Sequence, residues 1–185
     1  MLTHSGIAPL DARLGGMLPG RAHVLSGAPG TGKSLACLEF LNAGLERGEQ
    51  VALLTHDDPA DLLAQAEYLG IDLDAALRED RFALLRYQLD FASRFGRTPQ
   101  PSIAFNELRG LLGGCTPCRI AIDSIAPIID AGTAAGAGIS AMLEFLDRCN
   151  ATSPLTFPGD FSGRYDRRLE PIVQRAAAVL HMETG

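Results

Sequence analysis

The chain has 185 residues, of which 46% are hydrophobic and 21% charged, with a formal net charge of −6 at pH 7. This length and composition predict a single domain over residues 1–185 with a substantial core. The acidic balance argues against a surface built chiefly for duplex nucleic acid. No apolar run approaches the ~18 residues of a membrane span, and the N-terminus has no basic-then-apolar signal pattern. We therefore expect a cytoplasmic protein that does not associate with membranes.

Residues 1–20 form a short lead-in to the first predicted strand. Leu10 and Leu14 are one helical turn apart, and the following Gly15-Gly16 is typical of a helix end. A buried strand is then predicted over residues 21–26, and it leads directly into a glycine-rich loop.

The glycine-rich loop matches the pattern G-x-x-x-x-G-K-[ST] at every fixed position. Its residues are Gly27, Ala28, Pro29, Gly30, Thr31, Gly32, Lys33 and Ser34. Such a loop turns backbone N–H groups toward phosphate oxygens, and the next helix directs its positive end at them. We expect Lys33 to reach the β- and γ-phosphates, Ser34 to ligate Mg²⁺, and Leu35 to complete the nucleotide contact.

A chance match to this motif is expected roughly once in a thousand chains of this composition. The alternative is a glycine turn before an ordinary helix, here predicted over residues 35–47. Lys33 is the only lysine in the chain. A general preference for arginine explains why lysine is absent elsewhere, but it does not explain why the one lysine lies at this position.

Two carboxylates follow the second predicted strand, which spans residues 50–55. Asp58 suits a helix N-cap and Pro59 the first helical position, so we expect a helix from there to about Leu69. Asp57 and Asp58 also fall at a strand end, where an attacking water would be oriented. For Asp58, helix capping and catalysis both remain open.

Beyond this point, short apolar strands continue to alternate with amphipathic helices. Further strands are predicted over residues 82–87, 119–124, 151–157 and 177–182. Further helices are predicted over residues 73–79, 102–112, 141–149 and 167–174. Pro154 is expected to interrupt its strand, and the Gly/Ala-rich residues 131–140 are expected to form a mobile loop. The alternation predicts an α/β fold with a parallel sheet covered on both faces.

Two more residues at strand ends are candidates for the site. Asp123 ends an apolar strand and is expected to hold Mg²⁺ through water, with a turn cap as the alternative. Thr156 is a candidate sensor of the γ-phosphate, with an ordinary strand threonine as the alternative. Cys115 and Cys118 are interpreted as two loop cysteines, because no second close pair completes a zinc site.

The chain resembles the KaiC-type ATPase domain of the RecA superfamily, a group of P-loop (Walker A) NTPases. The residues that carry the resemblance are Gly6-Ile7, Leu10-Asp11, Gly15-Gly16, Arg21, the glycine-rich loop, the acidic pair and the strand ending in Asp123-Ser124. The resemblance covers about residues 5–182. It implies a three-layer, mostly parallel fold with core strand order 5-1-4-3-2, ATP and Mg²⁺ as ligands, an acidic pair that positions the lytic water, and sites between subunits of a hexameric ring.

Two departures from the family pattern affect the expected activity. The family usually has Glu-Glu where this chain has Asp57-Asp58, and aspartate is shorter by about 1.5 Å. A misplacement of ~1 Å can cost on the order of 10²-fold in rate. The family also continues into a C-terminal hairpin whose Lys and Arg residues act on a neighbouring subunit's nucleotide. This chain ends near Gly185, so we expect a truncated chain, a slow hydrolase or a nucleotide-gated binder, with an open sheet edge that invites a partner.

These features predict an ATP-binding domain with slow Mg²⁺-dependent hydrolysis, whose nucleotide state controls assembly or signalling. The partners would be copies of itself or another protein. The alternative is a non-hydrolysing module that binds ATP or ADP structurally. A DNA-associated, recombinase-like ATPase is a third interpretation, based on Arg164, Arg167 and Arg168. Nearby acidic residues offset these charges, so nucleic acid is not the expected partner.

Overall fold

The computed structural model describes residues 1–86, 105–106, 108–110, 112, 118–130, 135–159 and 169–183. The strands in these residues are β1 (Ala22–Gly27), β2 (Val51–Thr55), β3 (Phe82–Arg86), β4 (Arg119–Asp123), β5 (Ser153–Pro158) and β6 (Ala178–His181). The helices are α1 (Ala8–Leu14), α2 (Lys33–Leu45), α3 (Pro59–Tyr68), α4 (Leu73–Arg78), α7 (Ala126–Ile129), α8 (Ala135–Cys149) and α9 (Glu170–Arg175). Each predicted strand is present, within two residues at each end.

The described strands form one parallel sheet in the order β3-β2-β4-β5-β1-β6. With β3 set aside, the other five stand in the order 5-1-4-3-2, as the family resemblance implied. Strand β3 extends this core beyond β2. Because all the strands are parallel, the loops that follow β1, β2, β4 and β5 meet at one edge, where ligands of such sheets bind.

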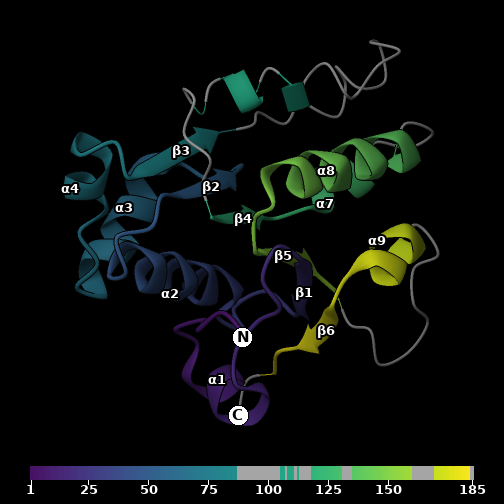
Figure 1. The fold of residues 1–185 in the computed structure, drawn as a ribbon, viewed down its shortest axis with the longest axis horizontal. Coiled ribbons are helices and arrows are strands. Elements are labelled where there is room, and N and C mark those ends of the chain that lie inside the picture. Colours follow the sequence, from purple (N-terminus) through teal and green to yellow (C-terminus); the bar gives the residue numbers. More distant parts are fainter. Residues whose placement is uncertain are drawn as a thin grey trace.

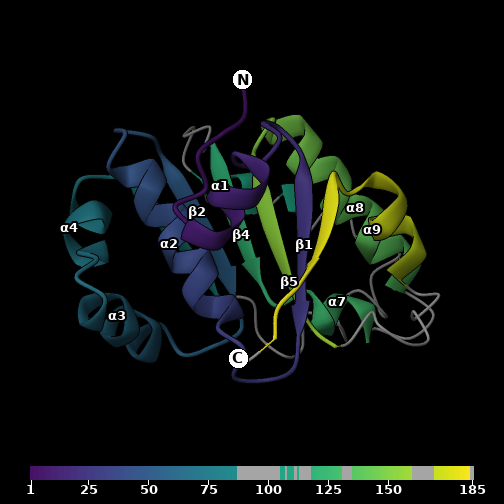
Figure 2. The same cartoon turned by 90° about the horizontal axis from the view of Figure 1, so that it is seen from below.

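Helices cover both faces of the sheet and create two hydrophobic cores (Figures 1 and 2). One core lies beneath α1, α2, α3 and α4, and includes Phe40, Leu41 and Leu53. The other lies beneath α7, α8 and α9, and includes Ile122, Met142 and Leu155. This arrangement confirms the predicted three layers. None of the helices in the described residues is long and apolar enough to cross a membrane.

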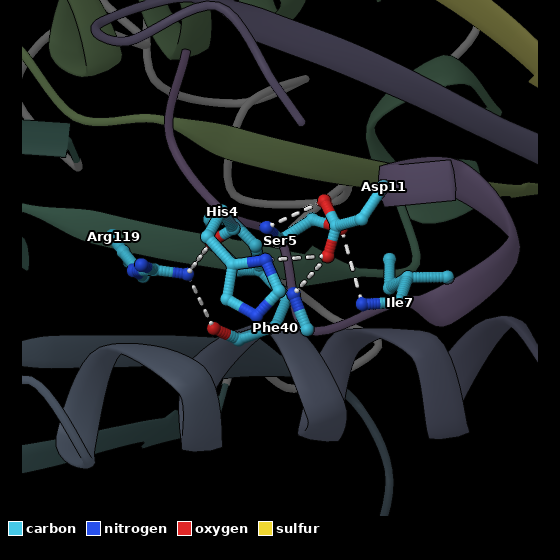
Figure 3. Close-up of polar contacts among 7 residues, drawn as sticks. His4, Ser5, Ile7, Asp11, Phe40 and Arg119 are labelled. Carbon is cyan, nitrogen blue, oxygen red and sulfur yellow. Dashed lines mark hydrogen bonds and ion pairs between the residues drawn. The ribbon is translucent and has the colours of Figure 1, made fainter. Parts of the chain in front are cut away.

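Asp11 on α1 organises the N-terminal lead-in (Figure 3). Its Oδ1 accepts hydrogen bonds from the backbone N and the Oγ of Ser5, at 2.9 and 2.8 Å. Its Oδ2 accepts from Gly6 N at 3.0 Å and lies 2.8 Å from Nδ1 of His4. One carboxylate therefore holds the chain before α1 in a fixed turn, which accounts for a Gly-Ile-x-x-Leu-Asp sequence at this place.

Arg119, the first residue of β4, joins this lead-in to α2 from a fully buried position. Its Nε donates to Glu49 Oε2 at 2.6 Å, and its Nη1 donates to the carbonyls of His4 and Phe40, both at 2.9 Å. The guanidinium also lies 4.8 Å from the centroid of the Phe40 ring. A buried charge is tolerated when it is paired and hydrogen-bonded in this way.

The structure contradicts the predicted interruption at Pro154, because β5 is continuous and buried there. Ser153 N donates to Arg21 O on the β1 side. Successive N–H groups of a strand point to opposite sides, so the N–H that proline lacks falls on the β4 side. On the β4 side, the residue of β5 that pairs with β4 is Leu155, which follows Pro154 and lies opposite Ile122.

The prediction of a mobile loop over residues 131–140 was wrong in its second half, because α8 begins at Ala135. At Gly138, a Cβ would lie 3.1 Å from Ile128 Cγ2 on α7. The small residues therefore permit close helix packing. Several other predictions lie outside the described residues: those for residues 131–134, Cys115, Arg164, Arg167 and Arg168. Within the helix predicted over 102–112, the described residues 105–106 and 108–110 are helical.

Candidate nucleotide site

The glycine-rich loop joins β1 to α2 at the carboxyl edge of the sheet. Gly30 and Gly32 have φ values of 83° and 85°, a region that favours glycine, and beyond their chain neighbours no atom lies within 4 Å of where their Cβ atoms would be. Ala28, Pro29 and Gly30 are exposed. The loop thus has the left-handed turns and the open surface that a phosphate nest needs.

Lys33, the first residue of α2, is buried beneath this loop. Its Nζ donates to the carbonyls of Gly27 and Ala28 at 2.9 and 2.7 Å, and to Thr31 Oγ1 at 3.3 Å. Burial lowers the pKa of Lys33, and the negative charge of Asp123 partly opposes that shift. The chain's single lysine is thereby held under the loop by the loop's own oxygens.

Asp123 ends β4, as the sequence predicted, and it lines the same two cavities as Ser34. Both residues line a cavity of about 430 Å³ that also includes Lys33. Both also line a neighbouring cavity of about 270 Å³ beside α3. A hydroxyl and a carboxylate are hard oxygen ligands of the kind that Mg²⁺ prefers.

The residues present fit Mg²⁺ bound together with a nucleotide. The described residues include no group of three or more His, Cys, Asp or Glu side chains arranged to hold a metal ion. Magnesium commonly takes one or two protein ligands and completes its shell with water and substrate phosphates. Ser34 and Asp123 would supply such a partial set.

Thr156 on β5 is fully buried and donates a hydrogen bond to Asp123 Oδ1. It also lines the 430 Å³ cavity together with Lys33, Ser34 and Asp123. Its hydroxyl is directed at the carboxylate, which it holds in one orientation. The sequence did not indicate this contact, because the two residues are 33 positions apart.

The two acidic residues after β2 differ in their environment. Asp58 caps α3, since its Oδ1 accepts from Ala60 N at 2.9 Å. The Asp57 carboxylate is 51% exposed and lies 3.5 Å from His56 Nε2. Asp57 lines both cavities together with Asp123, whereas Asp58 lines the 270 Å³ cavity. Of the pair, Asp57 is the carboxylate at the junction of the two cavities.

The sequence analysis missed four polar residues that line these cavities. His56 and Asp130 border the larger cavity, and Asp61 and Gln65 on α3 border the smaller one. Asp61 lies in the first turn of α3, three residues after the N-cap Asp58, and this spacing was a signal that could have identified it. Leu35, which was predicted to contact nucleotide, lies exposed on the first turn of α2.

The sheet order, the loop between β1 and α2, and Asp123 at the end of β4 define a RecA-like P-loop domain. A family profile described as "ATPase: KaiC" matches residues 3–168. The chain belongs to this KaiC ATPase family, and nucleotide binding with an ATPase-type function is the property of the family.

Several relatives are similar over part of their length. The chain is 31% identical over 126 residues to the circadian clock oscillator protein KaiC of Thermostichus vulcanus. The aligned region covers 67% of this chain and 23% of that protein. The chain is 38% identical over 85 residues to a UPF0273 protein of Thermotoga maritima, covering 44% and 34% of the two chains. A UPF0273 protein of Pyrobaculum aerophilum is 37% identical over 83 residues, covering 44% and 30%. The chain spans about a quarter of the length of the KaiC relative.

Proposed function

We propose that this domain binds ATP with Mg²⁺, hydrolyses it slowly, and uses its nucleotide state to control association with copies of itself or with a partner protein. The observation that carries the proposal is that two adjacent cavities share Ser34, Asp57 and Asp123 next to the buried ammonium of Lys33. A polyphosphate site needs this combination of a cation, hard metal ligands and a nearby carboxylate.

In the proposed complex, backbone N–H groups of the loop and the N-terminus of α2 bind the phosphates. Lys33 would turn from its carbonyl partners toward the β- and γ-phosphate oxygens. Ser34 and Asp123 would hold Mg²⁺, which neutralises phosphate charge when bound. Thr156, hydrogen-bonded to Asp123, would keep that carboxylate in position.

For hydrolysis, we assign the orientation of the attacking water to Asp57 and the start of α3 to Asp58. Asp57 is exposed to solvent beside the site, whereas Asp58 already uses one oxygen for the helix cap. Among the described residues that line the two cavities, Lys33 is the one permanent cation. An added arginine is typically worth 10³–10⁵ in the rate of phosphoryl transfer. A single subunit is therefore expected to be slow, and assembly into a ring that supplies a cation would accelerate it.

The second candidate is a module that binds nucleotide without hydrolysis. The half-exposed Asp57 favours it, because the rate of hydrolysis depends steeply on how accurately the group that orients the water is positioned. Nucleic-acid binding is not proposed, since the arginines on which it depended lie outside the described residues.

Nucleotide binding and single-turnover phosphate release, measured with Mg·ATP, test both candidates. We expect binding in the wild type, slow release that stops in EDTA, and a raised Mg²⁺ requirement in Asp123→Asn. The control Glu144→Gln removes an exposed charge on α8 and should behave as wild type. Binding without release would favour the module, and no binding of ATP, ADP or GTP at millimolar concentration would refute both candidates.

A further inference from the structure

A groove of about 590 Å³ lies between α3 and α4, away from the nucleotide site. Its lining combines apolar side chains from α3, from the connection and from α4, such as Leu63, Ile71 and Leu73, with the acidic residues Glu67, Asp72 and Asp74. The two helices lie together beside α2, at one end of the molecule (Figures 1 and 2). Tyr68 and Leu69, where α3 ends, are 93% and 40% exposed, so apolar surface continues past the groove.

The acidic charge of the chain is concentrated in the segment that includes α3 and α4, and Glu67, Asp72 and Asp74 of this segment line the groove. Residues 57–80 contain eight Asp and Glu but a single basic residue, Arg78, and thus carry a net charge of −7 against −6 for the whole chain. All other residues together carry +1. Within the described part of the chain, Glu67 and Asp74 are exposed and form no ion pair. Their charge is therefore available to a partner.

Helix α3 is the wall between this groove and the candidate nucleotide site. Asp58, Asp61, Leu62 and Gln65 line the 270 Å³ cavity on one side of the helix. Ala60, Leu63, Ala64 and Glu67 line the groove on the other side. Both sets follow the spacing of one helical face. A ligand that moves α3 would therefore act on both cavities.

We propose that this groove docks a basic amphipathic segment of a partner protein, with its apolar side chains over Leu63 and Ile71 and its Lys or Arg side chains facing Glu67 and Asp74. Helix-in-groove recognition uses such an apolar floor, and rim charges select the partner. A second copy of this chain fits less well, because it brings the same −7 segment and a remainder of only +1. Docking is coupled to the nucleotide site through α3, and this coupling alone rests on the proposed function.

The test uses the full chain and a labelled peptide of about 15 residues, built from Leu at helical spacing and Lys elsewhere. A peptide with Glu in place of Lys is the control ligand. We expect the Lys peptide to bind, and to bind more weakly between about 50 and 300 mM salt. Glu67→Gln with Asp74→Asn should lower its affinity roughly tenfold, whereas the charge-matched pair Glu144→Gln with Glu170→Gln should not.

A second variant blocks the groove without removing charge from its rim. Ala64→Arg places a long cationic side chain in the groove and should abolish binding, whereas Ala137→Arg on the exposed surface of α8 should leave binding intact. No binding by the wild type, or equal losses in the two charge pairs, would overturn the proposal. Self-association that Ala64→Arg abolishes, without peptide binding, would identify a second copy as the occupant and also overturn it.

The coupling has its own readout, the affinity for Mg·ATP with and without the Lys peptide. We expect a change of roughly fivefold or more, and an equal reciprocal change in peptide affinity. An unchanged nucleotide affinity would overturn the coupling and leave docking intact. If the chain binds no nucleotide at all, the proposed function fails, while the peptide measurement still decides the docking proposal.

Discussion

Helix α2 buries nine of its 13 residues, whereas α3 buries two of its ten. The first helix carries Lys33 and Ser34 on the phosphate side of the candidate site, and the second follows Asp57 and Asp58 on the hydrolytic side. Burying a large apolar side chain contributes about 1.5–3 kcal/mol. Displacing α2 therefore costs far more free energy than displacing α3.

The difference in burial between α2 and α3 suggests different roles for the two sides of the candidate site. Lys33 is held by three oxygens of its own loop, while the Asp57 carboxylate is half exposed. A rigid phosphate side suits binding, and an adjustable carboxylate side suits regulation. This contrast leads us to expect binding to be robust and hydrolysis to depend on what fixes α3.

The largest expected effect is on hydrolysis. Asp57→Asn should lower the single-turnover rate by about 10²–10⁴-fold, because it removes the carboxylate that we propose orients and polarises the water. The affinity for Mg·ATP should stay close to that of the wild type. Asp58→Asn is the matched control, since asparagine caps helices as well as aspartate does. A larger loss in Asp58→Asn than in Asp57→Asn would reverse the assignment.

The next effect is on binding and concerns the rigid side. Lys33→Ala should weaken Mg·ATP binding by roughly 10- to 100-fold, the worth of one charge-assisted hydrogen bond to phosphate. Titration calorimetry measures the loss. Arg47→Ala, which removes an exposed cation just after the same helix, should leave the affinity unchanged. An unchanged affinity in Lys33→Ala would contradict the site itself.

A smaller effect tests how α3 begins. Asp58→Ala should lower the free energy of unfolding by about 1 kcal/mol, because Ala60 N loses its cap. Asp58→Asn should restore the wild-type value, as measured by urea denaturation. Equal destabilisation by both substitutions would mean that charge, and not the cap, stabilises this helix.

The smallest effect is a pH dependence that arises in β1. His23 is buried, its Nε2 accepts from Leu18 N at 3.1 Å, and its Nδ1 lies 3.0 Å from Arg21 O, an arrangement that requires a neutral ring. Burial lowers the pKa of His23 below its ordinary value of 6.5. The unfolded chain then binds the proton more readily, so stability is lost as the pH falls below about 6.5. Urea denaturation of His23→Gln should show a weaker loss over this range, and an identical loss would exclude His23 as the cause.

The sequence by itself determined the elements whose signals are local. Apolar runs located the strands, Asp58-Pro59 marked the start of α3, and Gly15 marked the end of α1, where its φ is 76°. The motif around Lys33 predicted a glycine-rich loop between a strand and a helix, and the structure has this loop between β1 and α2. These predictions hold because propensity, capping and backbone conformation depend on residues close in the chain.

Only the tertiary structure decided the features that depend on distant partners. Strand β5 continues through Pro154 because it pairs with β1 from Ser153 to Pro158, and Thr156 orients Asp123 across 33 positions. Arg119 donates to the carbonyl of His4, 115 residues away. Helix α3 borders a cavity on each of its two sides, because β2 contributes to the wall of one cavity and α4 to the wall of the other. A sequence pattern reports which side chains share a helix face, but the packing of other elements determines what each face meets.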